Sequence, residues 1–117
     1  MTAFQPTLGA AVAQADQLSE VLKDDLQCGD RVLVTTGNST YSIQVIEDDW
    51  YSVSGGWFDR QCLSPWRTTI TGCSWGGSAI KLDIVAACGL HLEFGNGVLT
   101  SAIQEICVIP FGGNGDY

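Results

Sequence analysis

The sequence predicts a mainly β protein: a small SH3-like, partly open antiparallel barrel of about six strands, preceded by an N-terminal amphipathic helix. Three observations lead to this fold class. Apolar residues recur about every four positions before Gly29 and every two positions after it. The later stretches are short, rich in β-branched residues and separated by glycine turns. The 117 residues, 14 of them glycine, suit a single turn-rich domain.

The first 29 residues are expected to carry the helix. Between Leu8 and Leu26 the apolar residues are spaced by three and four positions, which places them along one face of a helix. Asp24 and Asp25 are unfavourable at the negative end of a helix dipole, so the helix should end near Lys23. We expect this segment to dock on the barrel, with docking on a second copy of the chain as the alternative.

The barrel is expected over residues 30–110 and begins with a meander. Residues 31–36 and 39–47 alternate as strands around Gly37–Asn38, residue types that tolerate the positive φ of a hairpin turn. Asp48–Asp49 then connects to a third strand that starts at Trp50. Later strands are expected near 68–73, 80–84, 88–94 and 98–110, and residues 111–117 are expected to form a flexible tail.

The stretch GCSWGGSAIK, residues 72–81, contains the GxxxxG spacing that opens a phosphate-binding loop. In such a loop a lysine follows the last glycine, whereas here Ser78 follows Gly77 and Lys81 comes three residues later. The residues after Gly77 alternate as a strand, and the helix that would complete a phosphate site is not predicted. We therefore expect a corner where two backbones approach closely.

Four stretches, TTGNSTYSIQV, TITGCSWGGSAIKL, GLHLEF and LTSAIQEI, resemble a family of short uncharacterised bacterial proteins. The resemblance covers residues 30–109 and leaves out the N-terminal helix and the segment WFDRQCLSPWR. It implies a compact mostly-β domain. The family carries no assigned activity, so the resemblance implies no catalytic residue.

Thirteen acidic residues against five basic ones give a formal net charge of −8. Nucleic acids and anionic membranes are poor partners for such a chain, because their binding depends on lysine and arginine. Basic proteins, cations and neutral small molecules remain open. The start of the chain lacks the basic region of a secretory signal, and no stretch has 18 consecutive apolar residues. We therefore expect a cytoplasmic location.

The chain has five cysteines, an odd number without close pairs, which are expected to be reduced and to act as small core hydrophobes. Outside the cell, two disulfides and one free thiol would become possible. Cys88 and His91 have a C-x-x-H spacing, but structural zinc sites usually show two paired knuckles. Cys88 is also expected to point into the core while His91 points away. We predict no metal and no cofactor.

His91 is the only histidine and shares its predicted strand face with Glu93. Such a pair could act in general acid–base chemistry, although a solvated outer face of a sheet needs the same residue types. A small-molecule or metal-dependent activity centred on His91 and Glu93, with a cysteine, is therefore the alternative function.

The segment WYSVSGGWFDRQCLSPW, residues 50–66, gathers large aromatic residues. Such residues either seal an open barrel end or form recognition surfaces. We expect a non-catalytic interaction module that binds a protein or peptide through this segment, as a monomer or small homo-oligomer; a self-assembling structural subunit is a further alternative. The expected contact residues are Trp50, Trp57, Phe58, Asp59, Arg60 and Trp66.

Overall fold

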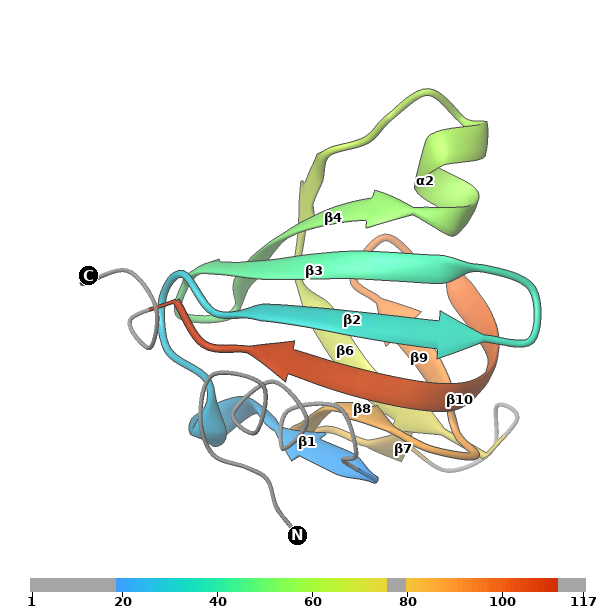
Figure 1. Ribbon diagram of the computed structural model, residues 1–117. Helices are drawn as coiled ribbons and strands as arrows, with labels where there is room; N and C mark the ends of the chain where they lie inside the picture. Colours follow the sequence, from blue (N-terminus) through green and yellow to red (C-terminus); the bar gives the residue numbers. More distant parts are fainter. Residues whose placement is uncertain (1–18, 76–79, 112–117) are drawn as a thin grey trace, which may run out of the picture.

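The computed structural model describes residues 19–75 and 80–111 (Figure 1). These residues are mainly β, and every strand pairing among them is antiparallel, which confirms the mainly β, antiparallel part of the prediction. The strands are β1 (Glu20–Leu22), β2 (Arg31–Thr36), β3 (Thr40–Glu47), β4 (Trp50–Gly55), β5 (Trp66–Thr68), β6 (Ile70–Ser74), β7 (Ile80–Lys81), β8 (Ile84–Ala87), β9 (His91–Phe94) and β10 (Leu99–Ile109). Two short helices accompany them, the 3-10 helix η1 (Lys23–Asp25) and α2 (Gly56–Arg60).

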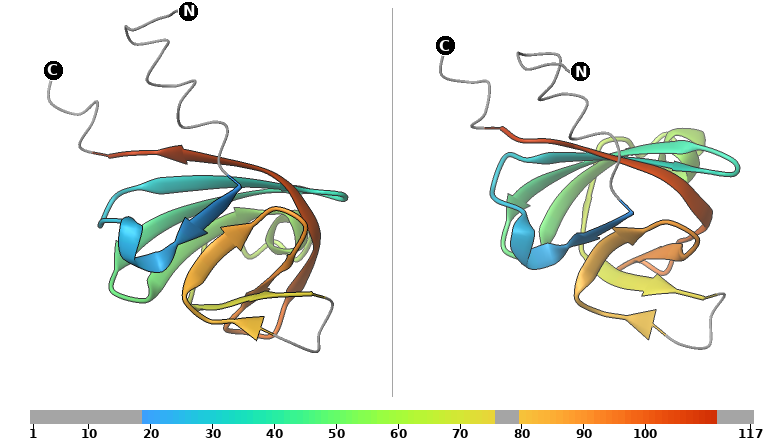
Figure 2. Two further views of the ribbon diagram at one scale, coloured as in Figure 1. Left: turned by 90° about the horizontal axis from the view of Figure 1, so that it is seen from below. Right: turned by 60° about the horizontal axis from the view of Figure 1, so that its bottom comes forward.

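Eight strands form one sheet in the order β5-β4-β3-β2-β10-β9-β6-β7, while β1 pairs with β8. The sheet folds over so that its two halves enclose the core, as the views in Figure 2 show. The long strand β10 belongs to both halves, since its first residues pair with β9 and residues 103–109 pair with β2. At the other corner a single residue, Thr69, separates β5 from β6.

A bulge in β10 produces the bend that joins the two halves. The pairing with β9 shifts register between Leu99 and Ala102. Within this shift the hydroxyl oxygen of Thr100 accepts a hydrogen bond from the backbone N–H of Leu92 at 3.0 Å. Bulges increase the local twist and bend of a strand, which explains how one strand serves two differently oriented halves.

The strands β2, β3 and β4 form the predicted meander, with buried and less buried residues alternating along each. The first turn lies at Gly37–Asn38, as expected, but neither residue has a positive φ. The hydroxyl of Thr36 instead accepts hydrogen bonds from the N–H groups of Asn38 and Ser39. The position of the turn was predictable, whereas its conformation depends on this threonine.

The predicted N-terminal helix does not extend into the part of the chain that the structure describes. Residues 1–18 lie outside the described ranges, and residues 20–23, expected to form the end of the helix, are β1 and the start of η1. Val21 is buried opposite Ala86 of β8, and all four residues of β8 are buried. Val21 and Leu26 therefore pack on the core from a short strand and the turn after it, rather than from a helix.

Of the expected C-terminal tail, residues 112–117 also lie outside the described ranges.

The structure has more strands than the predicted number of about six. The predicted strand 68–73 corresponds to two strands, β5 and β6, with a corner at Thr69 between them. The predicted strand 80–84 is interrupted at Leu82–Asp83 and becomes β7 and β8. Single-sequence alternation does not reveal such corners, because the period of two continues across them.

The glycine corner at Gly72 is confirmed as a close approach of two backbones. A Cβ atom at this position would lie 2.1 Å from the carbonyl oxygen of Lys81, and the φ of Gly72 is 151°. Gly77 and Ser78 lie outside the described residues, and the chain continues after them as the short strand β7, not as a helix. A phosphate-binding loop followed by a helix is therefore not formed here.

Candidate functional site

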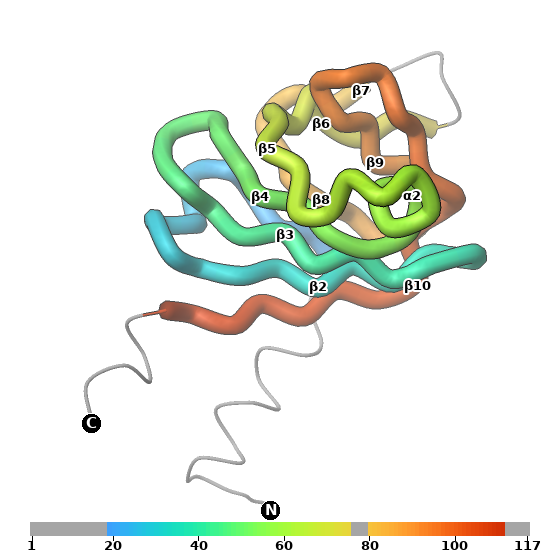
Figure 3. Tube along the Cα trace, turned by 90° about the horizontal axis from the view of Figure 1, so that it is seen from above, coloured from blue at the N-terminus to red at the C-terminus, as the bar shows by residue number. Residues whose placement is uncertain are grey.

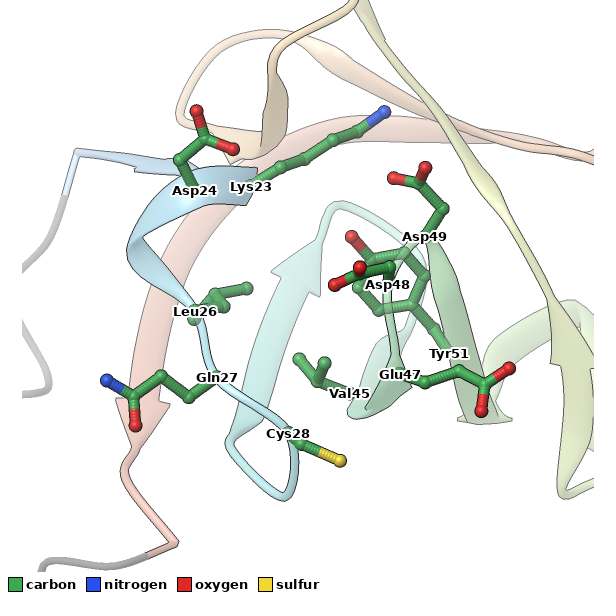
Figure 4. A pocket seen from close by; sticks show the side chains of 10 residues that line it. All are labelled: Lys23, Asp24, Leu26, Gln27, Cys28, Val45, Glu47, Asp48, Asp49 and Tyr51. Carbon is green, nitrogen blue, oxygen red and sulfur yellow. The ribbon is translucent and has the colours of Figure 1, made fainter.

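A cavity of about 560 Å³ lies at the end of the sheet where β3 turns into β4 (Figure 4). One wall is the turn between these strands, with Asp48 and Asp49. The opposite wall is η1 and the following residues up to Cys28. Between the walls, Leu26, Val45 and Tyr51 provide apolar surface.

The turn that forms the first wall is short. Glu47 pairs with Trp50 across it, so only Asp48 and Asp49 connect the two strands. Asp49 has a φ of 63°, a left-handed conformation that aspartate and asparagine adopt more readily than most residues. The two acidic side chains are thereby held at the mouth of the cavity.

The second wall is attached to β3 and to Phe111, which follows β10. The N–H of Gly29 donates to the carbonyl of Val45 at 2.8 Å, and the N–H of Val45 donates to the carbonyl of Asp30 at 2.9 Å. The carboxylate of Asp30 accepts hydrogen bonds from the N–H groups of Gln27, at 2.8 Å, and Phe111, at 3.0 Å. Asp30 therefore positions residues 27–29 but does not itself line the cavity.

Tyr51 places a polar group on the floor of the cavity. The residue is only 3 % exposed, yet its hydroxyl has no hydrogen-bond partner among the described residues. In Figure 4 this hydroxyl points toward the space between η1 and Asp48. Burial, and to a lesser extent the charge of Asp49, raises the pKa of Tyr51 to about 12. The hydroxyl is therefore protonated at neutral pH and can both donate and accept a hydrogen bond.

The rim of the cavity is acidic. Four carboxylates, those of Asp24, Glu47, Asp48 and Asp49, line it together with one amine, that of Lys23. Glu47 forms an ion pair with Arg67 of β5 at 3.4 Å. No ion pair within the described ranges involves the other three carboxylates. The rim therefore carries an excess of negative charge that is exposed to solvent.

The exposed indole of Trp50 is linked to this rim through Glu47, with which Trp50 pairs, and through Arg67. Trp50 lies between Asp49 and Tyr51 in the chain and is 39 % exposed. The guanidinium of Arg67 lies over its ring, 5.0 Å from the ring centroid, in a cation–π arrangement. Arg67 thus contacts both Trp50 and Glu47 and connects the cavity rim to the start of the aromatic segment.

The middle of the aromatic segment belongs to the core. Phe58 is fully buried, and Trp57 is half-buried and packs against the core. The ring of Phe58 meets those of Tyr41, Trp57 and Phe94 edge to face, with the closest centroid, that of Phe94, at 5.0 Å. Figure 3 shows α2, which carries Phe58, beside β9, which carries Phe94. Phe58 therefore seals the sheet at this end and offers no surface to a partner.

The polar residues of the same segment hold its loop together. The carboxylate of Asp59 accepts hydrogen bonds from the Ser64 hydroxyl and from the N–H of Gly55, and these bonds lower the pKa of Asp59. Arg60 donates to the hydroxyl of Ser39 at 3.2 Å. Both side chains are exposed, but each has an intramolecular role.

Trp66 does not share a surface with Trp50. It pairs with Val53 across β4 and β5, whereas Arg67, which covers Trp50, pairs with Ser52. Because successive residues of a strand point to opposite faces, Trp50 and Trp66 lie on opposite faces of the β4–β5 pair. The six predicted contact residues are therefore not one continuous site.

His91 and Glu93 lie on one face of β9, both half-buried, as the alternation predicts. The Nδ1 atom of His91 lies 2.9 Å from the carbonyl oxygen of Thr100, which fixes the ring against β10. Directly opposite His91 lies Ser74, whose buried hydroxyl has no partner among the described residues. Cys88 is exposed, so the expectation that it points into the core is wrong; its thiol donates to the carbonyl of Gln104.

The cysteines differ more in burial than the sequence suggests. Only Cys73 is buried, and burial raises the pKa of its thiol to about 12. Cys28 and Cys62 are exposed and Cys107 is half-buried, so a role as core hydrophobe holds for Cys73 alone. In residues 19–75 and 80–111, no group of three or more His, Cys, Asp or Glu side chains is arranged to hold a metal ion.

Sequence reasoning did not single out the residues of the cavity. Tyr51 lies inside the aromatic segment, yet it was not among the expected contacts. The acidic pairs at 24–25 and 48–49 were visible in the sequence, but the two segments come together through the long-range hydrogen bond between Gly29 and Val45.

Within the described part of the chain, no helix has the length and apolar character needed to cross a bilayer.

No protein-family model matches the chain, and neither the curated proteins nor the solved structures include a significant match. The resemblance to short bacterial proteins therefore stays a prediction.

Proposed function

We propose that this protein is a non-catalytic interaction module that binds a protein or peptide through the cavity and the adjoining indole of Trp50. The observation that carries the proposal is the cavity itself, which has an unpartnered hydroxyl on its floor and whose rim residue Glu47 pairs with the exposed Trp50. Exposed tryptophans next to a concave, partly apolar surface are typical of binding hot spots.

The proposal narrows the predicted contact surface to one end of the aromatic segment. Trp50 stays in the surface, and Arg67 and the cavity residues join it. Trp57 and Phe58 support the surface from the core, and Asp59 and Arg60 hold the loop that follows β4. An extended peptide that crosses the end of the β3–β4 hairpin would contact the indole and the cavity together.

Two finer expectations form part of this proposal. The meander β2-β3-β4 and the strand β10, shared between two halves of the sheet, support an SH3-like barrel. The five cysteines, an odd number without close pairs in the sequence, support a cytoplasmic location. The net charge of −8 argues against nucleic-acid and membrane partners.

The proposal is tested with peptides selected from a random display library on the full chain, with dissociation constants measured by fluorescence anisotropy. We expect Trp50→Ala to weaken the selected peptides about tenfold or more, as for a hot-spot tryptophan. The matched control is Trp75→Ala, which removes a tryptophan that is 59 % exposed and does not line the cavity. The control should bind like the wild type. Failure to enrich any peptide, or equal binding by both variants, would refute the proposal.

A further inference from the structure

The chemistry of the cavity identifies what part of a partner it would hold. The acidic rim has one internal cation, Lys23, and one neighbouring cation, Arg67, against four carboxylates. Asp24, Asp48 and Asp49 form no ion pair within the described ranges. Carboxylates that line one cavity without internal partners favour a positively charged group and disfavour an anion.

The floor of the cavity adds an independent observation. Tyr51 is 3 % exposed, and its hydroxyl, which has no partner among the described residues, points into the cavity. A hydroxyl without a partner in the protein is available for a hydrogen bond to a ligand. The oxygen of the hydroxyl can accept a hydrogen bond from an ammonium or guanidinium group.

The apolar lining fits the rest of such a side chain. Leu26 and Val45, with the ring of Tyr51, cover the floor below the carboxylates. Lysine and arginine bury their methylene stems along apolar surface while their charged ends stay among polar groups. The cavity provides both environments: apolar side chains for the stem and carboxylates for the charged end.

Resting on the proposed function, we propose that the cavity binds a lysine or arginine side chain of the partner polypeptide, with Tyr51 and the carboxylates of Asp24, Asp48 and Asp49 as its contacts. Trp50 then contacts the neighbouring residues of the same partner.

Removal of the Lys23 amine should change the affinity for a cation in the opposite direction to removal of a rim carboxylate. Its amine lies on the same rim and repels a second cation. Lys23→Gln should therefore bind a cationic probe more tightly than the wild type, whereas loss of a rim carboxylate should weaken the same probe. A merely structural role for these side chains would not produce opposite effects.

The cationic probes are Nα-acetyl-lysine methylamide and Nα-acetyl-arginine methylamide, whose side chains keep their charge. They are titrated into the full ¹⁵N-labelled chain at low salt. Norleucine and citrulline derivatives serve as neutral probes of similar shape. We expect the cationic probes to shift the amide signals of residues 23–28 and 45–51, and the neutral probes to leave them in place. Added salt should weaken the binding, because the rim is exposed. Equal shifts with neutral and charged probes would overturn the inference.

Neighbouring aspartates provide the matched control. Asp24 lines the cavity and Asp25 does not, although both are exposed residues of η1. Asp24→Asn and Asp49→Asn should each weaken the cationic probe about fivefold, the factor for one carboxylate about 4 Å from a cation in a water-like dielectric. Asp25→Asn should change the affinity less than twofold. Asn tolerates the left-handed φ of residue 49, so this variant keeps the turn. Equal effects at positions 24 and 25 would contradict a specific site.

The two proposals fail in different ways. If selected peptides bind and depend on Trp50, but no cationic probe shifts residues 45–51, the proposed function stands and the lysine or arginine site is wrong. If the cationic probes bind in the cavity and no peptide is enriched, the site is a binding site for small amines and the polypeptide partner is wrong.

Discussion

Two buried tyrosines on neighbouring strands differ in one respect, and this makes them a matched pair for mutation. Tyr41 of β3 and Tyr51 of β4 are 4 % and 3 % exposed. The hydroxyl of Tyr41 accepts a hydrogen bond from the N–H of Trp57 at 3.3 Å, whereas that of Tyr51 has no partner among the described residues. The same substitution, tyrosine to phenylalanine, therefore removes a hydrogen bond at one position and none at the other.

The expected stabilities follow from this difference. Tyr41→Phe leaves the N–H of Trp57 without its acceptor and should cost about 1 kcal/mol, or roughly 4 °C in melting temperature for a domain of this size. Tyr51→Phe removes a polar atom that makes no bond, so the free energy of unfolding should change by less than about 0.5 kcal/mol. Binding of the cationic probes should show the reverse order, since only Tyr51 lines the cavity.

The assay is thermal unfolding followed by circular dichroism at neutral pH, with the two variants and the wild type measured side by side. Equal destabilisation by both substitutions would mean that the Tyr51 hydroxyl has a structural partner. Unchanged probe binding by Tyr51→Phe would mean that the hydroxyl does not contact the ligand. Either result would refute the reasoning that assigns Tyr51 to the site.

Three further predictions concern the fold. Gly72→Ala should cost about 3 kcal/mol or more in urea unfolding, because the new Cβ would meet the Lys81 carbonyl at 2.1 Å; Gly37→Ala, whose nearest neighbours lie at 3.8 Å, should be neutral, and equal midpoints would contradict the close approach. Trp57→Ala should cost about 2 kcal/mol by the same assay, since the half-buried indole packs on the core; an unchanged midpoint would place it on the surface. In the wild type, stability should change little between about pH 6 and pH 8 and fall as pH rises from about 9 toward 12. The reason is that the folded-state pKa values of Cys73 and Tyr51 are raised to about 12, from 9.0 and 10.0, and unfolding favours the ionised forms. Cys73→Ala should remove the fall that begins near pH 9, and an unaltered profile would contradict the assignment.

Local features of the fold were predictable where one rule decides them. The alternation of Val32 and Val34 specifies the inward face of β2, and both residues are fully buried. The glycines at the corner indicated a close backbone approach, and Gly72 makes it. The alternation around Trp50 and Tyr51 also places one residue outside and the next inside, as observed.

Features that depend on tertiary pairing were not predictable. Residues 20–26 have apolar spacing compatible with a helix, but pairing with β8 draws Val21 into a strand, and this pairing joins segments more than 60 positions apart. The short helix α2 begins at Gly56, directly after Gly55, and was not expected, so the burial of Phe58 was not foreseen. The cavity requires the contact of Gly29 with Val45, which no local pattern encodes.

The most direct test of the central claim is the map of backbone amide shifts in the full ¹⁵N-labelled chain when a selected peptide is added. The account predicts that the largest shifts fall in residues 23–28 and 45–51 and at Arg67, around the cavity and the indole of Trp50. A map centred instead on α2, or on the exposed corner formed by Trp75, Ile80 and Leu82, would contradict it.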